Sequence, residues 1–329
     1  MFPSTTLLST REEWRGAANF LADLGYRSVL VDWPGWHQSN IPLNWSMEDE
    51  IGKKSMVDAF SDFAVSTLRH IHTSHNTGVI HVVCAGGNSA VYARRAMDQL
   101  GKEECHFGSL TCFSPSWRFY LPRTVIEGYP RKLARRQRFG AIFLSTFFVR
   151  SKMAFRIYKS KFGLAKLTRR LYDEKIQMNP ELLEAKREVI TRDRPLALDA
   201  AMIVGELDAV SSTESFLREL LGADLSTDQA EDSDDEDDGL LNLHVPQWAK
   251  QSEGAVSGSK GEPRAIPIQV VIPQDADSAD LREMRSVRDW AFHSGAVVSE
   301  ISGKLFAHEE SPALSASILH EFFANPSRR

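Results

Sequence analysis

Apolar residues along this chain follow two alternating patterns, one with the period of a helix and one with the continuity of a buried strand. Spacings of three and four residues predict amphipathic helices over residues 16–25, 55–72, 89–100, 280–290 and 311–323. Short apolar runs predict buried strands over residues 27–33, 78–84, 106–113, 266–272 and 296–301. Strands that alternate with helices predict an α/β fold whose parallel sheet is covered by helices on both faces.

A long segment interrupts this alternation before the strand at 266–272. Residues 115–222 are nearly all helical by period, so they are predicted to form a helical lid inserted into the α/β core. Residues 223–265 are rich in Ser, Gly, Asp and Glu with little apolar periodicity, which indicates a disordered acidic insertion. The core is therefore expected to combine residues 1–114 with residues 266–329.

Composition narrows the class of protein. The 329 residues are 42% hydrophobic and 25% charged, which is typical of a globular protein with a substantial core. The three cysteines form neither a disulfide scaffold nor a metal-ligand pattern, so no metal and no cofactor are expected. No apolar run reaches the ~20 residues of a membrane span, and the first residues lack the features of a signal peptide. We therefore expect a soluble, intracellular protein.

Charge is distributed unevenly along the chain. Between Pro115 and Arg170 there are 15 Lys or Arg residues against one acidic residue, Glu127. Aromatic residues interleave with these basic ones, a pattern that suits contact with an anionic membrane surface or the cover of an acyl ligand. The alternative is a lid whose apolar face packs on the core. Residues 231–238 hold seven acids in eight positions and are expected to be solvated. No nucleic-acid recognition module is visible, so no nucleic acid is expected as a partner.

Two motifs near the first strands resemble those of the α/β-hydrolase superfamily. The sequence DWPGWHQS (Asp32–Ser39) resembles the D-x-P-G-x-G-x-S turn after the fourth strand of these enzymes, with His37 in place of the second glycine. The next strand runs into AGGNSAVYARR, where the family has its G-x-S-x-G nucleophile elbow. Alignment puts Cys84 at the first glycine, Gly86 at the serine and Asn88 at the last glycine. The resemblance implies an α/β-hydrolase fold with a degenerate nucleophile elbow.

Four residues around this elbow are candidates for the site. Gly86 and Gly87 permit the strained backbone turn that an elbow needs. Ser89 lies three residues beyond the serine position, on the first turn of the helix, and Cys84 lies two residues before it. Each is a candidate nucleophile. The alternatives are a helix cap for Ser89 and a buried core cysteine for Cys84.

The resemblance also implies a catalytic histidine and an acid partner in loops after the later strands. The sequence GKLFAHEESP places His308 where the resemblance implies a catalytic histidine. Its acid partner is expected after the strand at 266–272, with Asp275 as the first candidate, Asp277 as the second and Asp208 as a third. The alternatives are a surface histidine and aspartates that only shape turns.

The second half of the oxyanion hole is expected near the start of the chain. Within TTLLSTREEW a strand of at most four residues precedes Ser9 and Thr10, which are the candidates. On the family plan the first strands of the sheet are then missing or supplied otherwise, and a truncated gene model is one explanation.

The combination of STREEW, DWPG, the missing elbow serine and KLFAHEESP resembles an uncharacterised branch of the α/β-hydrolases from photosynthetic microbes and plastid-bearing eukaryotes. The resemblance covers residues 5–222 and 266–322 and implies cytoplasm or plastid as the compartment. Two functions remain open. One is a hydrolase of an ester or similar acyl substrate, with His308 as base and water, Ser89 or Cys84 as nucleophile. The other is a non-catalytic protein that binds a small apolar or acyl ligand, or a partner, under the lid, and an anionic membrane surface is compatible with both.

Overall fold

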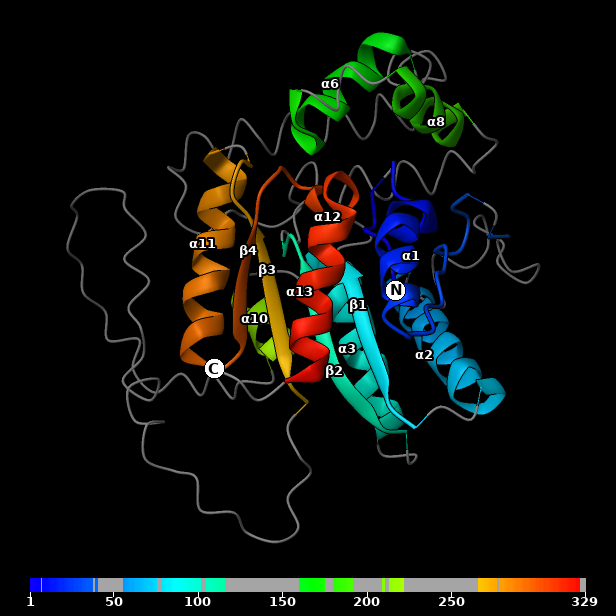
Figure 1. Ribbon diagram of the computed structural model, residues 1–329, viewed down its shortest axis with the longest axis vertical. Helices are drawn as coiled ribbons and strands as arrows, with labels where there is room; N and C mark the ends of the chain where they lie inside the picture. Colours follow the sequence, from blue (N-terminus) through cyan, green and yellow to red (C-terminus); the bar gives the residue numbers. More distant parts are fainter. Residues whose placement is uncertain are drawn as a thin grey trace, which may run out of the picture.

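The structure is a computed structural model (Figure 1). It describes residues 1–6, 8–37, 39–40, 56–75, 78–101, 105–115, 160–174, 180–191, 209–210, 213–221, 266–276 and 278–325. Most of the basic segment and the whole acidic run at 231–238 lie outside the described residues. The basic lid and the disordered insertion therefore stay predictions.

Four parallel strands form the central sheet. Their order across the sheet is the order of the chain, namely β1 (Ile80–Ala85), β2 (Phe107–Phe113), β3 (Ile268–Pro273) and β4 (Val297–Ile301). Nearly every position of β1 and β3 is buried, as expected of strands with helices on both faces. The predicted α/β class with a parallel sheet is confirmed.

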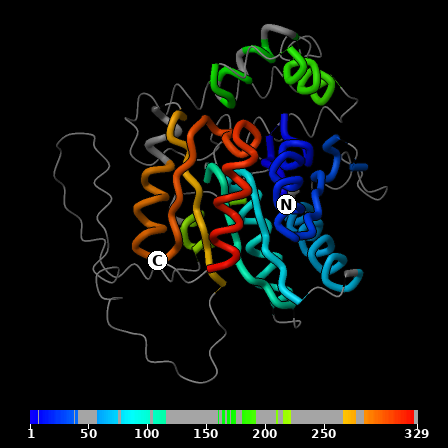
Figure 2. The backbone as a smooth tube through the Cα atoms, viewed as in Figure 1, coloured from blue at the N-terminus to red at the C-terminus, as the bar shows by residue number. Residues whose placement is uncertain are grey.

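One face of the sheet is covered by the first and last helices of the chain. α1 (Arg15–Asp23) packs beside α13 (Pro312–Ala324), and both lie on side chains from alternate strand positions such as Val83, Phe113 and Val271. Both helices were predicted from their apolar period within two residues at each end. Figures 1 and 2 show α13 in front of the sheet, running alongside the strands between β3 and β1 in this view.

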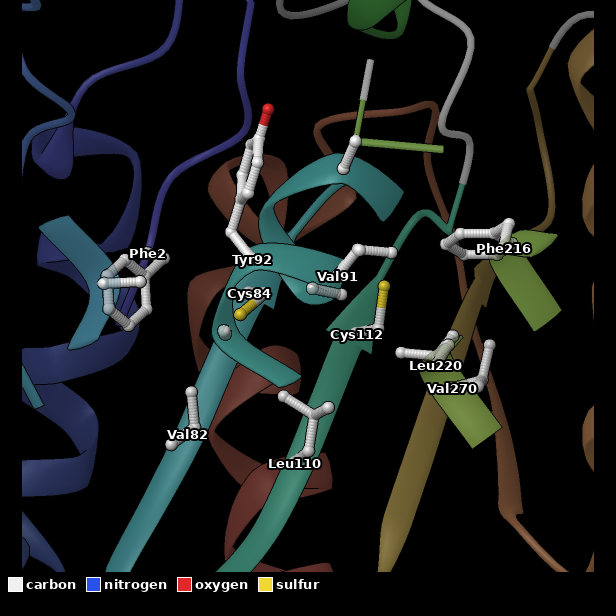
Figure 3. Close-up of a cluster of buried hydrophobic side chains, with 14 of the residues drawn as sticks. Phe2, Val82, Cys84, Val91, Tyr92, Leu110, Cys112, Phe216, Leu220 and Val270 are labelled. Carbon is white, nitrogen blue, oxygen red and sulfur yellow. The ribbon is translucent and has the colours of Figure 1, made fainter. Parts of the chain in front are cut away.

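The opposite face carries the larger part of the core. It is covered by α2 (Met56–His75), α3 (Gly87–Leu100), α10 (Thr213–Leu221) and α11 (Ser278–His293). Strand side chains that alternate with those of the first face, including Val82, Leu110 and Val270, point toward these helices (Figure 3). This alternation follows from the period of two along a strand. None of the described helices is long and apolar enough to cross a bilayer.

Four further helical elements in the described part of the chain lie toward the carboxyl ends of the strands. They are the 3₁₀ helix η1 (Arg11–Trp14), α6 (Lys161–Leu171), α8 (Pro180–Thr191) and α12 (Ala307–Glu310). Figure 1 shows α6 and α8 beyond this end of the sheet, on the same side as α12.

The first residues of the chain extend the sheet beyond β1. Phe2 makes two backbone hydrogen bonds with β1, at 2.8 and 3.0 Å. Met1 makes two more with the extended segment 29–31, at 2.7 and 3.3 Å. Residues 27–33, predicted as a strand, lie beside Met1 but are not a strand of the described sheet, so that prediction is wrong. The loop after Pro3 begins at the carboxyl edge of the sheet.

Close packing of α1 on α13 depends on a glycine. A Cβ atom on Gly16 would lie 2.7 Å from Cβ of Pro312, whose ring cannot swing away. Gly101, just after α3, has open space around it and a φ of −61°. We expect Gly16→Ala to lower the free energy of unfolding by about 1–3 kcal/mol. The matched control Gly101→Ala should leave it unchanged or raise it by up to ~1 kcal/mol. Urea denaturation measures both, and equal stabilities would contradict the close contact.

Candidate functional site

The turn from β1 into α3, which the sequence resemblance aligns with a nucleophile elbow, has glycine at the serine position. Gly86 stands at φ 78° and ψ 150°, a region that only glycine occupies readily. Its N–H donates to the Phe113 backbone oxygen at 2.8 Å, which ties the turn to β2. No side chain caps the N-terminus of α3, because Gly86 offers none. The turn therefore has positive φ at Gly86 and no hydroxyl at that position.

A small cavity of about 30 Å³ lies against this turn. Its walls come from the loop after Pro3, the elbow, the end of β2 and the segment before α12. The lining residues are Ser4, Thr5, Thr6, Ala85, Gly86, Gly87, Asn88, Ser114, Leu305 and Phe306. A water molecule needs roughly 10–15 Å³ of such space, so the cavity accepts a small polar group rather than a whole substrate.

The DWPGWHQS turn holds the wall formed by the loop after Pro3. The indole N–H of Trp33 donates to the Pro3 backbone oxygen at 2.8 Å, and that of Trp36 donates to the Thr6 backbone oxygen at 2.8 Å. Both indole rings are fully buried. The motif that resembles the α/β-hydrolase turn therefore acts here as a brace for the cavity wall.

A second contact fixes the other end of the same loop. Asp32 accepts a hydrogen bond from the backbone N–H of Arg11 at 2.7 Å, and its second oxygen lies 3.2 Å from Nδ1 of His37. His37 has a φ of 45°, in the left-handed region, at the position where the family motif has glycine.

Ser9 and Thr10 stand behind the cavity rather than on its wall. The Ser9 hydroxyl bonds to those of Ser4 and Thr6, at 2.6 Å for Thr6. Thr10 caps η1, with its side chain accepting from the backbone N–H of Glu12. The loop residues at the cavity are Ser4, Thr5 and Thr6 instead, and among the described residues the Thr5 hydroxyl has no hydrogen-bond partner.

Neither candidate nucleophile, Ser89 or Cys84, is available to react in this structure. The Ser89 hydroxyl donates to the Pro3 backbone oxygen at 2.6 Å, and its side chain is fully buried. Cys84 is also fully buried in the core, and burial raises the pKa of its thiol to about 12. Reaction as a nucleophile requires the thiolate, which is scarce near neutral pH with such a pKa. The side chains are close to the elbow, but neither reaches the cavity.

His308 is fully buried on α12 and lies outside the cavity lining. Its Nε2 is 3.3 Å from Oε1 of Glu13, which is also fully buried. The imidazole packs against the indole of Trp14, with ring centres 4.4 Å apart, and also contacts Phe306. Neither ring nitrogen makes a hydrogen bond of good geometry with a described residue. The histidine faces a carboxylate in the core rather than the elbow.

Asp275 does not partner His308. Its carboxylate accepts from the backbone N–H of Gly303 at 2.8 Å, and its own N–H donates to the Gly303 backbone oxygen. It is exposed and joins the loops after β3 and β4. Asp277 and Asp208 lie outside the described residues.

Sequence reasoning missed Glu13, the acid that does face His308. Thr10 and Glu13 have the spacing of a helix capping box, in which the glutamate turns back toward the cap. Here the carboxylate accepts from the Ser4 backbone N–H at 2.9 Å instead. Glu13 thereby bridges the cavity loop and His308, a role that the local pattern does not reveal.

The parallel sheet with helices on both faces, a glycine turn after β1 and a histidine after β4 are consistent with an α/β-hydrolase-like fold. No family model and no curated protein matches the chain. Solved structures similar to it include two crystal forms of the Vlm2 thioesterase domain with genetically encoded 2,3-diaminopropionic acid, bound with a dodecadepsipeptide. Their TM-scores are 0.39 and 0.38 at 13% and 14% identity, over 88% of this chain and 81% and 83% of theirs. The site is interpreted from its own geometry.

Proposed function

We propose that this chain is a non-catalytic α/β-hydrolase-fold protein that binds a small acyl ligand by its oxygen-bearing head group at the elbow cavity. The observation that carries the proposal is the hydrogen bond from Ser89 to Pro3, together with glycine at position 86. An acyl-transfer enzyme needs an activated hydroxyl or thiol at the elbow. The nearest hydroxyl on α3, that of Ser89, instead donates a hydrogen bond to the backbone. The resemblance to a branch that lacks the elbow serine supports the same conclusion.

The position of His308 argues against activation of a water molecule. A general base must lie within hydrogen-bond reach of the proton that it removes, directly or through one water. His308 does not line the cavity, and its Nε2 faces Glu13. The alternative function, hydrolysis of an ester, would need the imidazole to leave a contact with Trp14.

The chemistry of the cavity wall supports an acceptor oxygen as the bound group. The uncapped N-terminus of the 14-residue helix α3 presents backbone N–H groups and the positive end of the helix dipole. The Thr5 hydroxyl, on a residue that is 7% exposed, adds a donor from the opposite wall. Among the residues that the structure describes, the lining contains no carboxylate that would repel such a ligand. A carbonyl or carboxylate oxygen fits this set of donors.

Hydrolysis of short-chain and medium-chain nitrophenyl esters tests the absence of catalysis. We expect no turnover above a buffer blank for the purified protein, for His308→Ala or for Gly86→Ser, since a restored hydroxyl would still lack a base. Circular dichroism checks that each variant is folded. Turnover by the unmodified protein that disappears in a folded His308→Ala variant would contradict the proposal and favour the hydrolase.

Binding of decanoate, compared with decanol, tests the head-group preference. We expect the carboxylate to bind more tightly, and Thr5→Val to weaken it about tenfold, because a hydrogen bond to a charged group contributes roughly 1.5–3 kcal/mol. Thr191→Val, on the exposed side of α8, is the matched control and should have no effect. Titration calorimetry gives the dissociation constants. Equal affinities for the acid and the alcohol would rule out this mode of recognition.

A further inference from the structure

An ion pair between buried Lys186 and partly buried Glu309 joins α8 to the short helix that carries His308. Lys186 is 3% exposed, and its Nζ lies 2.8 Å from Oε2 of Glu309 and 3.4 Å from the backbone oxygen of Leu8. The same carboxylate oxygen accepts a hydrogen bond from the Tyr172 hydroxyl at 2.5 Å. Burial and the neighbouring Glu309 carboxylate raise the pKa of Tyr172 well above its usual value, so the phenol keeps its proton and donates.

This cluster surrounds Phe306, which is one wall of the elbow cavity. The Lys186 ammonium lies 5.4 Å from the centre of the Phe306 ring, and the Tyr172 ring meets it edge-on at 5.3 Å. The backbone N–H of Phe306 donates to the Leu171 oxygen at 3.0 Å. Residues from the end of α6 and from α8 therefore fix a ring that also lines the cavity.

The Lys186–Glu309 pair is not explained by a gain in folding stability. Taking two charges out of water costs several kcal/mol per ion, and apolar replacements of similar volume are often neutral or stabilising. Removal of one partner, in contrast, leaves an uncompensated buried charge. A buried pair of this kind is better suited to fixing one arrangement of the parts that it joins.

We propose that Lys186 is a positioning residue for the elbow cavity: through Glu309 and Tyr172 it holds Phe306 as the wall that closes the cavity. Exchange of a ligand then requires α8 and the end of α6 to release this wall. This role matters for function only if the cavity binds a ligand, so in that respect it rests on the proposed function. The closure itself is independent of which ligand binds, so it can be tested without one.

Accessibility of a thiol placed in the cavity wall tests the closure. Thr5→Cys puts the thiol at a lining position, and its labelling by an aromatic disulfide reagent is followed by absorbance and peptide mass spectrometry. The native Cys84 and Cys112 are fully buried, and burial raises the pKa of both thiols, so they do not compete. The third native thiol, Cys105, is 7% exposed, so it is replaced by alanine in every variant. Thr191→Cys, on the exposed side of α8, reports changes in the reagent that are unrelated to the cavity.

We expect Lys186→Met, combined with Thr5→Cys, to raise the labelling rate at least about tenfold, because local opening becomes easier once the pair is broken. Lys186→Arg keeps the charge and should restore slow labelling. Labelling of Thr191→Cys should be the same with Lys or Met at position 186. Where Lys186→Met does not fold, Glu309→Gln is the second variant, since it removes the charge and keeps an acceptor for Tyr172.

Two results would overturn the positioning role. One is a labelling rate for the methionine variant within about twofold of the parent. The other is a rise no larger than the rise in the global unfolding equilibrium measured in urea, since that would reflect general destabilisation. Faster labelling without any decanoate binding would reject the proposed function and leave the positioning role intact.

Discussion

The backbone oxygen of Pro3 is the acceptor on which the geometry of the site depends. It accepts one hydrogen bond from Ser89 at 2.6 Å and another from the Trp33 indole at 2.8 Å. These bonds join the first residues of the chain to the first turn of α3 and to the DWPG turn. Both donors are fully buried, so loss of the acceptor would leave each of them without a partner at a cost of about 1–3 kcal/mol. The loop that lines the cavity continues directly from this anchor.

Under the proposed binding function, the same anchor accounts for a hydrolase-like arrangement without the chemistry of acyl transfer. The serine and histidine side chains that acyl transfer would use both make contacts that stabilise the fold. The Ser89 hydroxyl secures Pro3, and the His308 imidazole packs on Trp14 beside Glu13. The elbow turn remains because Gly86 adopts its backbone conformation without strain. What is left at the elbow is a cavity with hydrogen-bond donors, which is suited to binding.

Local periodicity was sufficient to predict the core elements. The helices at α2, α3 and α13 and the four strands bury continuous or regularly spaced apolar residues, and their pattern is determined within each element. The site depends instead on contacts between residues far apart in the chain. Glu13 meets His308 across nearly the whole sequence, and no local pattern distinguishes it from a helix-capping glutamate.

The sequence predicted loops for Ser9 and Asp275 but could not show which hydrogen bonds they make. Ser9 was expected at the oxyanion loop, but three residues of the preceding loop reach the cavity because Pro3 is held by Ser89. Asp275 lies in the expected loop, yet its carboxylate is taken by the backbone of Gly303. In both cases a hydrogen bond from elsewhere in the fold decides the position.

Reaction with a fluorophosphonate probe measures the central claim most directly, because such probes add covalently only to an activated hydroxyl. The protein is incubated with the probe beside a catalytically competent serine hydrolase, and adducts are located by peptide mass spectrometry. The account predicts no adduct on any serine, since Ser89 donates its hydroxyl proton to Pro3 and has no base. A stoichiometric adduct at Ser89 would contradict it.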